Sequence, residues 1–251
     1  PPVLFEDESF IAFDKPSGLL VAPDRWDKER ENLADMIHEQ LSPNFFNVHR
    51  LDRDTSGVIL VAKTKKALDA ASNLFHSREV QKQYVAIAHG LPKEEKGTIR
   101  MAIVEDEERP GKMKTVRHGK PAVTDFEVVE RWRRYALVKL VPHTGRTHQL
   151  RVHLAAIGCP VVCDRFYGDG RGLMLSELKK HYKQHADRPE RPLIGRLALH
   201  AEVLSLPHPI TGEPMILRAP LPDDFELALK YLRRYSGGAG GRSAEPRSPE
   251  S

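Results

Sequence analysis

The sequence has very little cysteine and no long apolar run. Its two cysteines, Cys159 and Cys163, form a single C-x3-C pair, which predicts neither a disulfide framework nor a four-ligand zinc site. No stretch approaches the roughly eighteen consecutive apolar residues that cross a bilayer, and the first residues lack a basic and apolar leader. We therefore expect a cytoplasmic protein without membrane contact. The chain begins with Pro-Pro rather than Met, which leaves room for a further N-terminal segment.

An excess of charge of one sign is also missing. The 251 residues include 39 Lys and Arg against 35 Asp and Glu, a net charge of +4 that is too small to predict nucleic-acid binding by itself. With 40% hydrophobic and 29% charged residues, the composition excludes collagen, coiled coil and general disorder. The length suits one large or two small domains. We find no internal repeat.

Strand and helix patterns are mixed along the chain, which predicts an α+β fold. We expect one catalytic domain over residues 1–235, followed by a disordered tail over 236–251 that has no large apolar residue. The expected strands cover 3–5, 10–13, 58–62, 83–88, 122–129, 136–141 and 197–204. The expected helices cover 33–40, 64–78, 147–157, 175–182 and 223–235.

A dense polar group precedes the apolar run 58–62. Asp52 and Asp54 are bracketed by Arg50 and Arg53. Asp54 begins a segment whose residues are typical of a turn. Asp52 follows a leucine and is expected to lie nearer the buried end of the segment. A carboxylate in such a place needs a cationic partner. Arg151, on the side of the predicted helix 147–157, is a candidate for that partner and would keep Asp52 ionised.

Strand 83–88 has two unlike faces. Period-two alternation places Val85 and Ile87 on one face, and their bulk suits a core. Tyr84 shares the other face with two alanines, which leaves room for a ligand to approach its ring.

The segment 109–120, RPGKMKTVRHGK, is rich in Lys and Arg and contains no acid. It predicts an exposed hairpin or loop. Such a loop is either a solvated surface or a contact for the phosphates of a nucleic-acid backbone, and the pattern alone leaves both interpretations open.

Other chemistries receive little support from the sequence. The D-x-D of Asp52 and Asp54 resembles that of metal-dependent transferases, but no further carboxylate cluster or phosphate-binding glycine loop accompanies it. His143, His148 and His153 are five residues apart and do not share a helix face, so we expect no metal site. There is no G-x-S-x-G motif for a serine nucleophile.

Several long motifs, in order and spacing, resemble those of RluA-type pseudouridine synthases. They are DKPSGL at 14–19, HRLDRDTSGVILVAKT at 49–64, EVQKQYVA at 79–86, HTGRTHQLRVHLAAIGCPVVCDRFYG at 143–168 and RLALHAEVLSLPHP at 196–209. The resemblance covers nearly everything from Val3 to about Leu221. Two departures are Cys163, where the family commonly has Gly before the Asp, and a longer insertion over 168–191.

The resemblance implies an RNA uridine isomerase with a mixed, mainly antiparallel sheet, flanking helices and a positively lined cleft. In the implied reaction the C1′–N1 bond of a uridine breaks, the uracil turns, and a C1′–C5 bond forms, without cofactor or metal. Asp52 falls on the family's catalytic Asp, as nucleophile at C1′ or as base at C2′. Tyr84 falls on the tyrosine that stacks on the uracil, and Arg151 on the active-site basic residue.

The resemblance also implies base flipping out of a structured loop of ribosomal or transfer RNA. Arg50 would fill the vacated stack, although a plain phosphate contact remains an alternative for it. Histidines His148, His153 and His200 are expected to be structural, and His49, Thr55, Ser56 and Gly57 to hold the loop. The residues expected to contact RNA are Arg50, His49, Arg53, Lys112, Lys114, Arg117, Lys120 and Arg146.

Two other functions remain open from the sequence. A nucleoside or glycoside hydrolase also uses a carboxylate at an anomeric carbon, but usually needs a second one as acid. An inactive RNA-binding or assembly factor would keep the scaffold without the chemistry. For the isomerase we expect a monomer with no obligatory protein partner.

Overall fold

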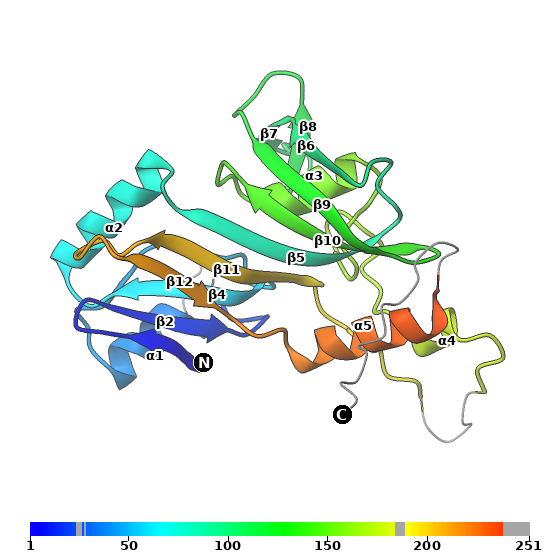
Figure 1. Ribbon diagram of the computed structural model, residues 1–251, viewed down its shortest axis with the longest axis horizontal. Coiled ribbons are helices and arrows are strands. Elements are labelled where there is room, and N and C mark those ends of the chain that lie inside the picture. Colours follow the sequence, from blue (N-terminus) through cyan, green and yellow to red (C-terminus); the bar gives the residue numbers. More distant parts are fainter. Residues whose placement is uncertain (24–26, 28, 184–188, 238–251) are drawn as a thin grey trace, which may run out of the picture.

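A computed structural model describes residues 1–23, 27, 29–183 and 189–237 of the chain (Figure 1). The elements follow in the order β1 (Val3–Glu6), β2 (Phe10–Lys15), α1 (Leu33–Gln40), β3 (Phe46–Asn47), β4 (Ser56–Ala62), α2 (Lys65–Ser77), β5 (Gln81–His89), β6 (Lys96–Arg100), β7 (Ala102–Glu105), β8 (Met113–Val116), β9 (Val123–Arg131), β10 (Tyr135–Pro142), α3 (Gln149–Ala156), α4 (Leu175–Leu178), β11 (Leu199–Pro207), β12 (Pro214–Arg218) and α5 (Asp223–Tyr235).

A ten-stranded sheet runs through the described residues in the order β1-β2-β4-β11-β5-β10-β9-β6, with β12 beside β11 and β3 beside β4. All of its strand pairs are antiparallel except β4 with β11. Strands β7 and β8 form a separate antiparallel hairpin. The α+β prediction and the mainly antiparallel sheet are thus confirmed.

Strand β4 is buried along its whole length because helices cover both of its faces. Val58 and Leu60 pack with residues of α2, whereas Ile59 and Val61 pack with residues of α1 on the other side. A strand covered on both sides needs an unbroken apolar sequence rather than an alternating one. The packing on both faces therefore explains why residues 58–62, predicted to form a buried strand, are all apolar.

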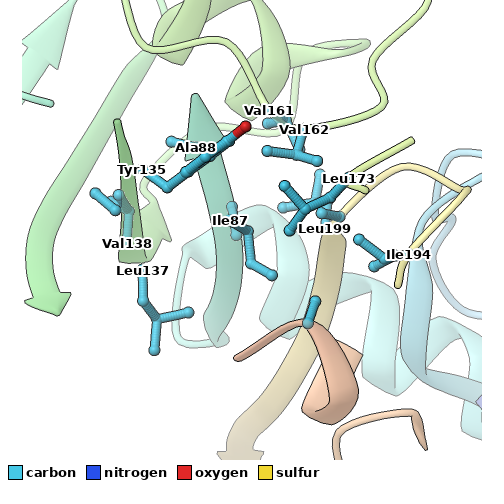
Figure 2. Close-up of a cluster of buried hydrophobic side chains, with 14 of the residues drawn as sticks. Ile87, Ala88, Tyr135, Leu137, Val138, Val161, Val162, Leu173, Ile194 and Leu199 are labelled. Carbon is cyan, nitrogen blue, oxygen red and sulfur yellow. The ribbon is translucent and has the colours of Figure 1, made fainter. Parts of the chain in front are cut away.

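The largest core cluster lies around β5 and β10, where α3 and α5 pack (Figure 2). The expectation of one open face along β5 was wrong for most of the strand. Ala86 and Ala88 are as fully buried as Ile87, and of the three residues expected on the open face only Tyr84 is half-buried. The two small alanines therefore admit close packing against the sheet rather than a ligand.

The positions of the predicted helices and strands are largely confirmed, with one clear correction. The helix expected over 175–182 ends at Leu178, because the next residue is extended and His181 has a positive φ of 58°. Strands β3, β6, β7 and β12 were not predicted. The predicted disordered tail lies almost entirely outside the described residues.

Cys163 has a backbone conformation that favours glycine. Its φ is +64°, in the left-handed region, where a side chain is disfavoured. Cys163 directly precedes Asp164, and the RluA-type pattern commonly has Gly at position 163. The departure therefore keeps the backbone turn and adds a buried thiol, whose Sγ donates to the carbonyl of Ile194 at 3.3 Å.

None of the helices within the described ranges is long and apolar enough to cross a membrane.

Candidate active site

The sheet topology brings Asp52 and Tyr84 together. Because β4 and β11 are parallel, their first residues lie side by side, and His200 pairs with Ser56. Strand β5 runs antiparallel to β11, so that Tyr84 lies opposite Ala201. Asp52 belongs to the loop that enters β4 and accepts a bond from the Thr55 N–H through its carbonyl at 3.1 Å. The loop that carries Asp52 and the side chain of Tyr84 therefore meet at one edge of the central strands.

A cavity of about 180 Å³ lies at this point. Its walls include all three predicted catalytic residues, Asp52, Tyr84 and Arg151, together with Lys82 and Thr55. Among the described residues that line it, Asp52 is the only carboxylate, and its side chain is 20% exposed. The buried Thr55 Oγ1 has no hydrogen-bond partner within the described part of the chain. The cavity thus offers a carboxylate, cations and one unsatisfied hydroxyl to a polar occupant.

Arg151 pairs mainly with Asp164, a residue that the sequence analysis did not assign. Its Nε and NH2 donate to the two carboxylate oxygens of Asp164 at 2.7 and 2.8 Å, whereas its NH1 lies 3.6 Å from Asp52 Oδ2. Both members of the Arg151–Asp164 pair are buried, with side-chain exposures of 4% and 0%. Arg151 therefore reaches Asp52 as predicted, but its orientation is fixed by Asp164.

Two rings hold the same guanidinium in place. The Cζ of Arg151 lies 5.4 Å from the ring centroid of Phe166 and 5.2 Å from that of Tyr167. The backbone N–H groups of Phe166 and Tyr167 donate to Asp164 Oδ1 at 2.9 and 3.1 Å. Asp164 is thus fully hydrogen-bonded, which a buried carboxylate requires. The signal in the sequence was the run DRFYG, which carries the acid and both rings.

Tyr84 is held in its protonated form. Burial raises the pKa of its hydroxyl, and the nearby negative charge of Asp52 raises that pKa further. On the same strand, burial lowers the pKa of Lys82, whose Nζ lies 5.7 Å from the Phe75 ring centroid. The Tyr84 side chain therefore presents a neutral aromatic ring to the cavity.

A buried lysine anchors the loop that carries Asp52. The Nζ of Lys15 donates to the carbonyls of Pro16, Leu19 and Arg53 at 2.8, 2.7 and 2.9 Å, and its side chain is fully buried. Burial lowers the pKa of Lys15 to about 8, although the charges of Asp54 and Asp52 act in the opposite direction. The DKPSGL motif thus contributes a lysine that fixes the Asp52 loop, a role that the sequence analysis did not identify.

The start of β4 is fixed to β11 by a close backbone approach. Gly57 has a φ of +116°, and a Cβ at this position would lie 2.2 Å from the carbonyl oxygen of Ala201. The Oγ of Ser56 lies 2.9 Å from His200 Nδ1 and accepts from Arg196 NH1 at 3.2 Å. These contacts agree with the loop-holding role expected for Ser56 and Gly57.

The His49 side chain contacts other parts of the protein rather than the cavity. Its Nε2 accepts a hydrogen bond from the Leu60 N–H at 3.0 Å, and its ring stacks on Phe75 at 5.2 Å. Burial lowers the pKa of His49 to about 3, so that its ring is neutral at neutral pH. These contacts favour the loop-holding role for His49 over its expected contact with RNA.

The other residues expected to contact RNA lie on two sides of the cavity. Arg50 and Arg146 line its wall, and Arg146 Nε donates to the carbonyl of Pro121 at 3.2 Å. Arg53 lies outside the cavity wall and forms an exposed ion pair with Asp54 at 2.9 Å.

The remaining four lie on or beside the β7–β8 hairpin, which confirms the predicted exposed basic hairpin. Lys112 Nζ lies 5.5 Å from the ring centroid of Tyr167, and Lys114 forms an ion pair with Asp106 at 3.3 Å. Arg117 and Lys120 are exposed. The hairpin therefore carries its cations beside Tyr167, one of the two rings that contact the Arg151 guanidinium.

A short chain of hydrogen bonds connects this hairpin to His148 in the cavity wall. The Met113 N–H of β8 donates to the Tyr167 hydroxyl at 2.8 Å, and that hydroxyl lies 2.9 Å from His148 Nδ1. Burial lowers the pKa of His148, against the opposing influence of Asp52. A neutral His148 can accept from Tyr167, which in turn accepts from Met113. His148 thus has a structural partner in Tyr167 while also lining the cavity.

The described residues contain no group of three or more His, Cys, Asp or Glu side chains placed to hold a metal ion. Cys159 and Cys163 are both buried and unpaired.

Comparison with known proteins identifies relatives over most of the chain. The sequence model of the RNA pseudouridylate synthase family matches residues 9–156. A dual-specificity RNA pseudouridine synthase RluA of Escherichia coli is 39% identical over 87% of this chain and 92% of the relative. The ribosomal large subunit pseudouridine synthase D of Xanthomonas campestris is 34% identical over 94% of this chain and 71% of that protein.

Solved structures agree with these relatives. The human RNA pseudouridylate synthase domain containing 1 superposes with a TM-score of 0.70 at 28% identity, covering 96% of this chain and 90% of its own. The human domain containing 4 protein gives 0.69 at 28% identity, covering 92% of each chain. The chain therefore belongs to the RNA pseudouridylate synthase family and is an RNA pseudouridine synthase of the RluA type.

Proposed function

We propose that Asp52, Tyr84 and Arg151 isomerise a uridine that has been flipped out of a structured loop of ribosomal or transfer RNA. The observation that carries this proposal is the single cavity that all three side chains line. Its volume of about 180 Å³ is below the roughly 300 Å³ at which drug-sized sites begin and suits one pyrimidine ring. The names of the curated relatives, which mention the ribosomal large subunit and dual specificity, support this substrate class.

In this proposal Asp52 acts at the sugar. In one route its carboxylate attacks C1′ as the C1′–N1 bond breaks, and the resulting ester bond breaks when C5 of the turned uracil bonds to C1′. In the other route the carboxylate removes the C2′ proton as the C1′–N1 bond breaks, and returns that proton to C2′ when C5 bonds to C1′. The C5 proton is then lost and N1 gains a proton, so the product is an isomer of the substrate. Arg151, 3.6 Å from Asp52 and held by Asp164, positions the carboxylate through the reaction.

Tyr84 serves as the platform on which the uracil stacks. Its raised pKa keeps the hydroxyl protonated at neutral pH, which favours stacking over removal of the C5 proton by a phenolate. The unsatisfied Thr55 hydroxyl lies in the same cavity and can bond to a polar atom of the nucleotide.

Base flipping and RNA binding use the cations around the cavity. Flipping a base costs a few kcal/mol and costs least in a loop. Exposed Arg50 beside the cavity is placed to enter the vacated stack. The hairpin lysines and arginines, with Arg146, bind the phosphates of the flanking nucleotides.

A hydrolase is the alternative that the geometry disfavours. Glycoside hydrolysis uses a second carboxyl group roughly 5–9.5 Å from the first. The described residues that line the cavity include Asp52 alone, and nearby Asp164 is committed to Arg151. The site therefore lacks the acid that would release a free base.

Release of tritium from RNA containing [5-³H]uridine tests the proposal. Ribosomal and transfer RNA transcripts, and total RNA that lacks pseudouridine, are incubated with the wild-type protein. We expect tritium release without free uracil. Free uracil would indicate a hydrolase, and no release from any of these RNAs would indicate an RNA-binding protein without this activity.

We infer further that residues 1–235 act as one catalytic domain in a cytoplasmic monomer. The ten-stranded sheet connects all of the described strands except those of the β7–β8 hairpin, and the two buried, unpaired cysteines suit a reducing compartment. Light scattering after size-exclusion chromatography should give a mass near 28.4 kDa, whereas twice that mass would contradict the monomer.

A further inference from the structure

A second basic hollow lies at the other end of strands β5 and β10 from Tyr84. Tyr135, the first residue of β10, pairs with His89 at the end of β5, five residues beyond Tyr84. Between this point, α4 and the end of α5 there is a hollow of about 1090 Å³. Figure 1 shows α4 and α5 together at this end of the molecule, away from α2. We call this hollow the α4–α5 groove.

The groove is lined by cations from three separate segments. They are Arg133 and Arg134 before β10, Lys179 and Lys180 after α4, and Arg234 in α5. All five are exposed. Within the described residues none of them forms an ion pair, whereas neighbouring Arg233 is paired with Glu130.

The groove offers little negative charge to balance these cations. Glu177 is the only acid among its described lining residues, and its carboxylate accepts a bond from the Tyr135 hydroxyl at 3.1 Å. The cations also have aromatic support, because Lys179 Nζ and Arg234 Cζ lie 5.8 and 5.3 Å from the Tyr235 ring centroid. Such a concave, unpaired positive surface attracts a polyanion.

We propose that the α4–α5 groove binds the phosphate backbone of the substrate RNA outside the loop that enters the catalytic cavity. Most of the groove's cations come from the insertion over 168–191 and from α5, which the catalytic chemistry does not use. The proposal rests on the RNA substrate proposed above. It assigns to the insertion a role in RNA affinity rather than in turnover.

One RNA can occupy both places. The five residues from Tyr84 to His89 span about 17 Å of strand at roughly 3.3 Å each. A helical nucleic-acid strand carries a phosphate about every 3.4 Å of its axis, so a stretch of about five nucleotides bridges this distance. A stem next to the target loop is therefore the part of the RNA that this groove would hold.

Binding of an RNA without uridine tests the groove separately from the catalytic site. The probe is a labelled duplex of about 20 G·C base pairs, and its affinity is measured over a series of salt concentrations. The test variant combines Arg133→Gln, Lys180→Gln and Arg234→Gln. We expect its affinity to fall about tenfold or more at 0.1 M salt, and the slope of log K against log salt to fall by about 2 to 3.

A matched variant controls for the loss of three charges. It combines Lys66→Gln, Lys93→Gln and Arg218→Gln, which are exposed cations outside the groove. This variant should bind with nearly the wild-type slope, and a variant with Arg133→Lys and Arg234→Lys should retain affinity. The proposal is overturned if the groove variant binds like the wild type, or if the control loses as much affinity.

Turnover separates this proposal from the proposed reaction. With a substrate transcript, the groove variant should raise KM and leave kcat within about twofold, because these residues do not line the catalytic cavity. If the wild type releases no tritium from any RNA, the proposed reaction fails while the duplex-binding result still decides the role of the groove.

Discussion

At the scale of single residues, the site depends on pairs whose members are far apart in the sequence. Asp52, Tyr84 and Arg151 could be named from motifs because each lies in a segment with a strong pattern. Lys15 and Asp164 could not, since their roles appear only when Lys15 meets the carbonyl of Arg53 and Asp164 meets Arg151. A sequence shows that a lysine or an aspartate is present, but not which residues will form hydrogen bonds with it in the fold.

Loss of Arg151 should cost stability as well as activity. Arg151→Ala leaves the buried Asp164 carboxylate without its cation, a change that typically lowers the free energy of unfolding by about 3–5 kcal/mol. Urea denaturation at pH 7 measures this loss. A variant as stable as the wild type would show that the Arg151–Asp164 pair does not hold the site together. Arg165→Ala, at an exposed neighbour, is the control and should change stability little.

His49 should make the protein less stable in acid. Its pKa is lowered from 6.5 to about 3, so the unfolded chain gains a proton below about pH 6.5 while the folded protein stays unprotonated there. Stability should therefore fall as the pH decreases through this window, by up to about 1.4 kcal/mol per pH unit for this group. His49→Gln, which can still accept from the Leu60 N–H, should make the slope between pH 5.5 and 4 shallower.

Denaturation by urea at several pH values gives these slopes. His118→Gln, on the exposed side of the basic hairpin, provides the comparison and should keep the wild-type slope. Equal slopes for wild type and His49→Gln would contradict the neutral, buried state of His49.

At the scale of elements, apolar patterns predicted most of the helices and strands of the sheet. They failed where tertiary contacts override local preference. Helix α4 is short because Leu178 is its only buried anchor, and the lysines that follow it have no core to face. Strand β12 went unpredicted because its Ile216 is exposed and its pairing with β11 fixes it instead.

The β7–β8 hairpin should be loosened by removing one hydroxyl. Tyr167→Phe leaves the Met113 N–H without its acceptor and breaks the contact to His148, at a cost of about 1–3 kcal/mol if the group stays buried. Hydrogen exchange of the Met113 amide should speed up, and RNA affinity should fall with the hairpin's position. Tyr231→Phe, a half-buried tyrosine that lines neither the cavity nor the α4–α5 groove, is the matched control. Unchanged exchange at Met113 would contradict this role for Tyr167.

At the scale of the whole molecule, the sheet holds a small catalytic cavity between larger basic surfaces. The near balance of 39 basic and 35 acidic residues hides this arrangement, because the charges are sorted in space rather than in number. The basic hairpin was visible as a run in the sequence. The α4–α5 groove was not, since Arg133, Lys180 and Arg234 come together only in the fold.

The central claim is that the Asp52 carboxylate performs the reaction in a preformed site. Turnover and RNA binding of Asp52→Asn test it most directly, with Asp54→Asn as the control for loss of a neighbouring carboxylate. We predict that Asp52→Asn binds substrate RNA within a few-fold of the wild type but releases tritium from C5 at least about 10³-fold more slowly, while Asp54→Asn stays active. Turnover by Asp52→Asn near the wild-type rate would contradict the catalytic role of Asp52.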